Sequence, residues 1–185
     1  MARSAAGAGV SASEQADVVE RDGGAGAIGL REVLIFVIVS LALLMSSIDN
    51  TIVSVGLPDM MSGLKTNLIW ISWVITAYSL AQTIVMPMAG KLSDDLGRKR
   101  LFLGCVVVFT TSSFLCAIAP NVYLLIFFRV LQAIGGGAFM PSAAGIVSDV
   151  FGTKHRATAI GLFTSVFPIG GIIGPNLGGW VIDHY

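Results

Sequence analysis

Long runs of apolar residues alternate with short polar segments along this chain of 185 residues. A helix needs about 20 mostly apolar residues to cross the hydrocarbon core of a bilayer. Five runs reach about that length, and they cover residues 33–57, 69–89, 101–119, 122–147 and 157–182. We therefore predict five transmembrane helices joined by short polar connections.

Prolines and polar clusters mark where the predicted helices end. Pro58 follows the first run and is expected to end its helix, and Pro120 with Asn121 is expected to form a turn after the third run. The remaining connections are the polar stretches 59–68, 90–100 and 149–156. Consecutive helices are thus expected to run in opposite directions.

Composition excludes a soluble domain. Hydrophobic residues make up 55% of the chain and charged residues only 12%, whereas soluble domains carry about 25% charged residues. The net charge is zero, so the overall charge indicates nothing about partners. The placement of the charges is more informative.

Residues 1–30 differ from the rest of the chain. They are rich in Ala, Gly and Ser, with scattered charges and no apolar periodicity, so we expect a flexible tail. This stretch does not have the pattern of a cleaved signal peptide. We expect the first apolar run to act as its own insertion signal.

The distribution of Lys and Arg predicts the orientation, because cytoplasmic loops carry an excess of these residues. With a cytoplasmic amino terminus, nine cations lie inside and only Lys65 lies outside. The nine are Arg3, Arg21, Arg31, Lys91, Arg98, Lys99, Arg100, Lys154 and Arg156. We therefore predict a multi-pass protein of the cytoplasmic membrane, with the tail and the 90–100 segment inside the cell.

Two ionisable residues of opposite charge stand within the predicted spans. Asp49 lies about 24 Å along the first helix from Val33, and Arg129 lies about 12 Å inward from Asn121 in the fourth. An ionisable residue at such depth is costly unless it faces protein or water, which makes it a functional candidate. At similar depths the two are expected to pair or to share a water-filled cavity. The alternatives are that Asp49 sits at the outer interface, and that the pair is purely structural.

Some other residues of the spans carry weaker signals. Gln132 follows Arg129 by three positions and shares its helix face, and we consider it, with Tyr78 of the second run, a candidate for lining a substrate cavity. Cys105 and Cys116 lie about 16 Å apart along one helix, too far for a disulfide. We expect both cysteines to be small packing residues.

The densest charge cluster is Gly90-Lys91-Leu92-Ser93-Asp94-Asp95-Leu96-Gly97-Arg98-Lys99-Arg100. Asp94 and Arg98 are four residues apart and can pair on a helical turn. A positive-inside anchor with capped helix ends would explain the cations, but it would not explain Asp94 or the two glycines.

Glycines recur every four residues in the fifth run, at Gly170, Gly174 and Gly178, with Pro175 and Gly179 beside them. Such a stripe lets another helix backbone come close, and the proline removes a hydrogen bond and introduces a bend. Small-residue stripes are common in membrane bundles, so ordinary packing is the alternative to a special role.

Several of these segments resemble motifs of the major facilitator superfamily, in the order in which that family has them. Residues 48–58 resemble the first-helix motif of its drug–proton antiporters, from which Ser54 and Gly56 depart. Residues 90–100 resemble the loop between its second and third helices, with Asp95 where the family usually has a basic residue.

The later runs extend the resemblance. The segment Arg129-x-x-Gln132-Ala133-x-Gly135 is similar to the fourth-helix motif, with Ala133 in place of a glycine. Residues 170–179 match Gly-x-x-x-Gly-Pro-x-x-Gly-Gly, the fifth-helix signature of the antiporters, which favours export over uptake. Residues 73–80 of the second run resemble the corresponding stretch of the superfamily's fourteen-helix antiporters.

The resemblance implies an all-α integral membrane protein with the major facilitator fold, here the first five transmembrane helices of an incomplete amino-terminal six-helix bundle. It implies proton-coupled efflux of drugs or other small amphipathic molecules, with Asp49 and Arg129 in proton coupling. It also implies a cytoplasmic latch loop, whose residues are Gly90, Asp94, Gly97 and Arg98, and an antiporter helix motif, whose residues are Gly170, Gly174, Pro175, Gly178 and Gly179.

The implied partners are the lipid bilayer, protons, a small amphipathic substrate and the missing carboxyl-terminal half of the transporter. We expect no cofactor beyond the proton gradient, no metal, no enzymatic activity and no nucleic acid, and a fragment that is inactive alone. Two alternatives stay open: a small membrane protein that binds or regulates a full transporter, and an uptake transporter of the same superfamily.

An odd number of spans predicts that the carboxyl terminus, at residues 183–185, lies outside the cell. A tag fused there should react with a membrane-impermeant reagent in intact cells, whereas a tag on the amino terminus should react only after permeabilisation. A carboxyl-terminal tag that reacts only after permeabilisation would contradict this topology.

Overall fold

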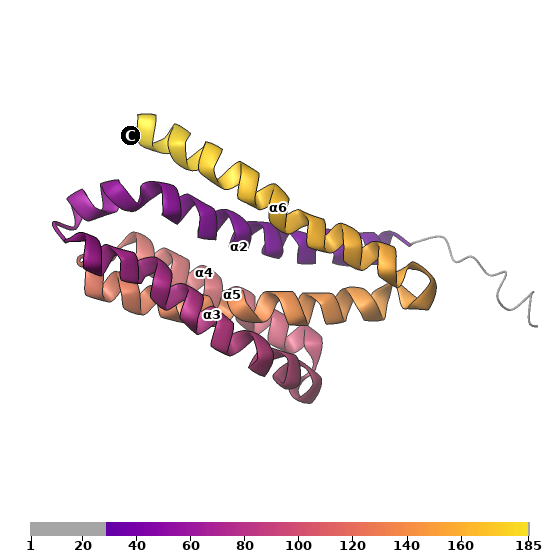
Figure 1. Ribbon diagram of the computed structural model, residues 1–185. Coiled ribbons are helices and arrows are strands. Elements are labelled where there is room, and N and C mark those ends of the chain that lie inside the picture. The colour runs from indigo at the N-terminus through magenta and orange to yellow at the C-terminus, as the bar shows by residue number, and fades with distance from the viewer. Residues whose placement is uncertain (1–28, 185) are drawn as a thin grey trace, which may run out of the picture.

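The computed structural model describes residues 29–184, except the side chains of Lys154 and Asp183. This range contains five helices and no strand. They are α2 (Leu30–Gly63), α3 (Leu68–Leu96), α4 (Arg98–Ala117), α5 (Val122–Val150) and α6 (Gly152–His184) (Figure 1). The expected tail falls almost entirely on residues 1–28, which lie outside the described residues.

Each of the five helices is long and apolar enough to cross a membrane. An all-helical, multi-pass membrane fold is therefore confirmed. Four of the helices are longer than the apolar runs from which they were predicted. Helix α2 has 34 residues, α3 and α5 have 29 each, and α6 has 33.

The expectation that Pro58 ends the first helix was wrong. Pro58 lies inside α2, which continues to Gly63. A proline lacks one N–H group and therefore removes a single hydrogen bond, the one that would reach the carbonyl of Ser54. The polar connection is correspondingly short, at residues 64–67.

The two polar stretches predicted to be cytoplasmic are also mostly helical. The 90–100 segment stays helical except at Gly97, whose φ of 89° lies in the left-handed region that favours glycine. Within the expected loop 149–156, only Phe151 separates α5 from α6. Polar residues beyond the apolar core can continue a helix into the interface, where the backbone hydrogen bonds are still satisfied internally.

Asparagine side chains begin two of the helices. Asn67 accepts a hydrogen bond from the backbone nitrogen of Trp70 at 3.0 Å, and Asn121 accepts one from that of Leu124 at 2.9 Å. Each side chain satisfies a donor that the first helical turn leaves free. The turn expected at Pro120 and Asn121 is present.

Helix α5 lies at the centre of the bundle. It packs along both α3 and α4 and also touches α2 and α6, whereas α6 packs mainly against α2 (Figure 1). In its most apolar window 56% of residues are buried, against 17–22% in the other four helices. The helices thus form an α3–α4–α5 group and an α2–α6 pair, which meet at α5.

Three consecutive glycines let α5 take this central place. A Cβ atom on Gly135 would lie 2.8 Å from the backbone nitrogen of Phe109 in α4. On Gly136 it would lie 2.9 Å from the hydroxyl of Tyr78, and on Gly137 it would lie 3.1 Å from the carbonyl of Gln82, both in α3. Because successive helix positions point in different directions, one short run accommodates two neighbouring helices.

The glycine stripe of α6 faces α2. Gly170 lies against Ser47, Gly174 against Thr51 and Gly178 against Ile52. By contrast, a Cβ on Gly171 or on Gly179 would meet nothing within 4 Å. The Ser47 hydroxyl reaches across this contact and donates to the carbonyl of Phe167 at 2.7 Å. The α2–α6 pair is therefore a close backbone approach strengthened by a polar contact.

Replacing Gly174 by alanine should weaken the α2–α6 contact, because the new methyl group would collide with the side chain of Thr51. We expect a loss of about 1–3 kcal/mol in the free energy of unfolding, the usual cost of overpacking. The matched control is Gly171→Ala in the same helix, where the added methyl group meets open space. Unfolding in mixed micelles measures both variants, and equal stabilities would contradict this packing.

Candidate functional site

The two charged residues of the spans form an ion pair inside the bundle. Asp49 of α2 accepts a hydrogen bond from Arg129 Nη1 of α5, which lies 2.8 Å from its Oδ2 atom. Its other oxygen, Oδ1, accepts from Gln132 Nε2 at 2.9 Å. The side chains of Asp49 and Arg129 are only 15% and 8% exposed. The pairing expected from their depths is therefore present, while their part in proton coupling stays a prediction.

Two apolar clusters enclose the pair. One includes Leu43 and Phe139 and lies on the side of the α3–α4 turn, and the other includes Val53 and Leu125 and lies on the side of the α2–α3 connection. Asp49 and Arg129 stand between them along α2 and α5. This position largely shields the charges from solvent, so that each depends on the other.

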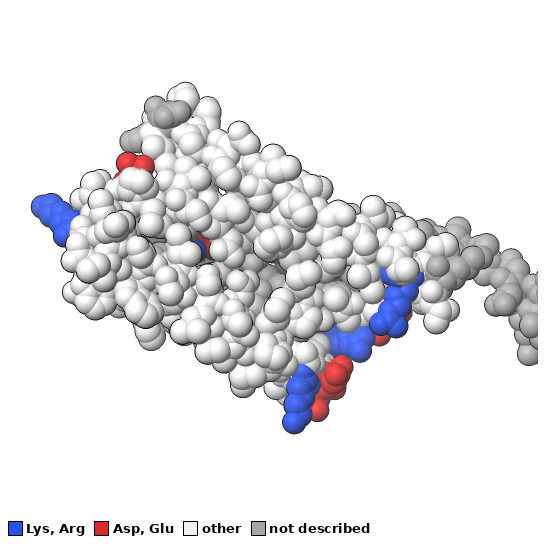
Figure 2. Space-filling model, viewed as in Figure 1, with Lys and Arg blue, Asp and Glu red and all other residues white. Residues whose placement is uncertain are grey.

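Two other helices also reach the pair. Tyr78 of α3 places its ring 5.9 Å from the Arg129 Cζ atom, and the sulfur of Cys116 in α4 lies 3.8 Å from Gln132 Oε1. Four helices thus contribute side chains to the site around this ion pair. Figure 2 shows the contrast with the rest of this face, where charged side chains gather at the two ends of the bundle.

This arrangement holds one ionisable carboxylate against one permanent cation inside the bundle. A carboxylate held by a cation can accept a proton, which cancels the attraction between the two helices that carry them. Breaking a buried ion pair leaves an uncompensated charge and costs about 3–5 kcal/mol. A proton on Asp49 would therefore alter how α2 holds α5.

Arg98, at the start of α4, joins three helices at the end of the bundle that contains the α3–α4 turn. Its Nη1 atom donates to the carbonyl of Gly145 at 2.9 Å and to Asp149 Oδ1 at 2.6 Å, both in α5. Its Nη2 atom lies 3.5 Å from Asp94 Oδ1. A Cβ on Gly145 would lie 2.8 Å from Arg98 Cδ, so this glycine makes room for the arginine.

The sequence of the chain also matches a known protein family. Residues 39–185 match the model of the Major Facilitator Superfamily, which is more than half of the chain. The chain belongs to the Major Facilitator Superfamily. The family resemblance of the four sequence motifs is thereby confirmed.

Curated relatives in this superfamily are much longer than the chain. The multidrug transporter protein MdtP of Bacillus subtilis is 40% identical over 143 residues, which is 77% of this chain and 26% of MdtP. The riboflavin transporter RibZ of Clostridioides difficile is 36% identical over 82% of this chain and 33% of its own length. The multidrug export protein EmrB of Escherichia coli is 32% identical over 85% of this chain and 31% of its own length. The chain thus spans about a quarter to a third of these relatives.

The contacts of the 90–100 segment, which resembles the superfamily loop motif, differ in part from those predicted. The expected pair of Asp94 and Arg98 exists, but Asp149 is the closer partner of Arg98. Sequence reasoning missed Asp149, although its position as the acid at the carboxyl end of the fourth run was a usable signal. Gly97 provides the turn, whereas a Cβ on Gly90 would meet nothing within 4 Å.

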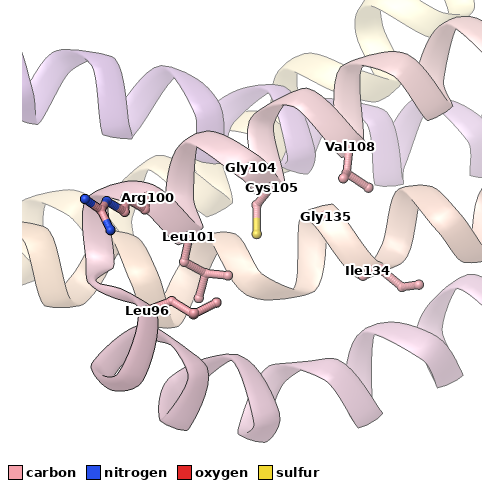
Figure 3. A pocket seen from close by; sticks show the side chains of 8 residues that line it. All are labelled: Leu96, Arg100, Leu101, Gly104, Cys105, Val108, Ile134 and Gly135. Atoms are coloured by element: carbon pink, nitrogen blue, oxygen red, sulfur yellow. The ribbon is translucent and has the colours of Figure 1, made fainter.

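The residues expected to line a substrate cavity lie outside two cavities of the structure. A cavity of about 410 Å³ lies between the end of α3, α4 and α5, with a mostly apolar lining and Arg100 at one end (Figure 3). A groove of about 1550 Å³ lies between the start of α2, the α3–α4 turn and the end of α5. Tyr78 and Gln132 line neither and are buried beside the ion pair.

The Arg98 contacts predict unequal couplings in a double-mutant cycle. Alanine at Arg98 and Asp149 should show a coupling energy of about 0.5–1 kcal/mol, as partly exposed pairs do. The same cycle with Asp94 should give a value near zero, because that separation is 3.5 Å and the Asp94 side chain is 70% exposed. Unfolding free energies in micelles measure both cycles. A larger coupling with Asp94 would contradict this assignment.

Proposed function

We propose that this chain is the amino-terminal part of a proton-coupled exporter of drugs or other small amphipathic molecules across the cytoplasmic membrane. The observation that carries the proposal is the buried contact between Asp49 and Arg129, with both carboxylate oxygens occupied by partners from α5. The names of MdtP and EmrB, both multidrug transporters, support the substrate class.

In the proposed mechanism, Asp49 takes up a proton and releases Arg129. The α2–α6 contact does not depend on this charge, because glycine packing and the Ser47 hydroxyl hold it. Protonation therefore acts on the α2–α5 junction and leaves the α2–α6 pair together. A ligand shifts such an equilibrium only by its differential affinity for the two states, and here the proton provides that difference.

The Arg98 contacts provide the second proposed element. They join the α3–α4 turn to the end of α5 on the side that the cation distribution predicts to be cytoplasmic. We assign them the role of a latch that stabilises one of the two states. The proton gradient drives the cycle, and no cofactor, metal or nucleic acid takes part.

The remaining part of the transporter is the necessary partner. Alternating access requires two helical bundles that rock about a site near the midplane, and this chain spans 26–33% of the relatives named above. The chain expressed alone should therefore give no proton-dependent extrusion of drugs.

A second candidate is transport of a defined metabolite, including uptake. It is favoured by the relative named as a riboflavin transporter. Direction distinguishes the two candidates: an exporter lowers cellular accumulation of its substrate in a proton-dependent way, whereas an uptake transporter raises it.

A chimera tests the export proposal. Residues 39–185 would replace the matching region of MdtP, and the chimera would be expressed in a host deficient in drug efflux. We expect it to lower accumulation of a fluorescent drug, and we expect a protonophore to abolish this effect. Asp49→Asn should reduce the extrusion rate at least about tenfold, because the amide cannot take up the proton.

The control for this substitution is Asp59→Asn, which changes an exposed acid of the same helix. It should extrude the drug as the parent chimera does. If Asp49→Asn transported as well as Asp59→Asn, with the same sensitivity to the protonophore, the proposed proton coupling would be overturned. Proton-dependent accumulation of riboflavin would instead support the second candidate.

A further inference from the structure

We propose that Tyr78 is a positioning residue whose ring holds the Arg129 guanidinium in place when Asp49 is protonated. The inference rests on the proposed protonation of Asp49 and adds the group that stabilises the protonated state. It concerns the aromatic ring and not the hydroxyl group.

The contact between ring and cation is buried. The Arg129 Cζ atom lies over the Tyr78 ring, 5.9 Å from its centroid. A guanidinium within about 6 Å of a ring face is attracted by the ring quadrupole, most strongly where both groups are desolvated. Tyr78 is 2% exposed and the Arg129 side chain 8% exposed, so this condition is met.

The hydroxyl of Tyr78 does not hold Arg129. Its oxygen is buried, faces the Ser46 side chain of α2 and makes no hydrogen bond to Arg129. The Nε atom of Arg129 has no hydrogen-bond partner in the described range. The ring face is therefore the contact that these two side chains share.

The need for the ring follows from the charges around the site. Arg129 stays charged at all relevant pH values, so a proton on Asp49 leaves it as a buried cation without a counter-ion. Gln132 offers no charge, α4 brings the thiol of Cys116, and residues 157–182 of α6 contain no Asp, Glu, Lys, Arg or His. Tyr78 from α3 brings an aromatic ring, which attracts a cation.

Gly136 gives the ring its place. A Cβ there would lie 2.9 Å from the Tyr78 hydroxyl, so even alanine must displace the phenol. This residue offers an independent way to disturb the ring without changing Tyr78 itself.

The test uses the 185-residue chain in lipid bilayers and needs no transport. Infrared difference spectra recorded across pH follow the carboxyl band, and Asp49→Asn identifies the part of that band that belongs to Asp49. Tyr78→Leu should make protonation harder and lower the midpoint pH by about one unit, equivalent to about tenfold. Tyr78→Phe keeps the ring and should leave the midpoint unchanged.

The outcomes separate the alternatives. An equal shift in Tyr78→Phe and Tyr78→Leu would overturn the proposal in favour of the hydroxyl, and no shift in Tyr78→Leu would overturn it outright. Circular dichroism checks the helix content of each variant. If Tyr78→Leu loses helix content, Gly136→Ala replaces it, with a smaller shift in the same direction expected and an unchanged midpoint overturning the proposal.

This measurement is also separate from the transport test. A midpoint that depends on the ring, together with a chimera whose transport does not need Asp49, would leave the role of Tyr78 intact and reject the proposed coupling. An Asp49 carboxyl that takes up no proton over the accessible pH range would overturn the role of Tyr78.

Discussion

The structure depends on one constraint, which is that a charge inside the membrane must have a partner. Asp49 and Arg129 stand on different helices, and neither is stable at its depth without the other. Their contact therefore ties α2 to α5 and, together with the packing of α6 on α5, joins the α2–α6 pair to the α3–α4–α5 group. Under the proposed mechanism, the contact that joins the two groups is also the one that a proton on Asp49 releases.

Glycines let the helices around this contact pack closely. Helices in a membrane gain little from the hydrophobic effect and associate through close packing. The run at residues 135–137 lets α3 and α4 approach α5, and the stripe that includes Gly174 lets α6 approach α2. At the end of α5, Gly145 likewise leaves room for Arg98, which reaches from α4 to the Gly145 carbonyl. The charged contacts and the glycines therefore act together.

Sequence reasoning predicted the helices better than it predicted their ends. Apolar length decides whether a segment crosses the membrane, and all five spans were found in this way. It does not decide where a helix stops, because hydrogen bonds continue into the interface, which is why Pro58 lies within α2 and Gly97 alone separates α3 from α4. Likewise, spacing within one helix suggested the pair of Asp94 and Arg98, but it could not indicate that Asp149 lies closer.

The sequence by itself determined that this chain contains five membrane-spanning helices and two charges that require partners. It could do so because length, hydropathy and the cost of burying a charge are local properties. Only the tertiary structure decided which atoms meet: that Gln132 takes the second oxygen of Asp49, that the Tyr78 ring lies beside Arg129, and that Gly136 leaves room for that ring. These contacts join residues from different helices. Their geometry depends on how closely the helices pack and how they are rotated about their axes, which no single segment of the chain specifies.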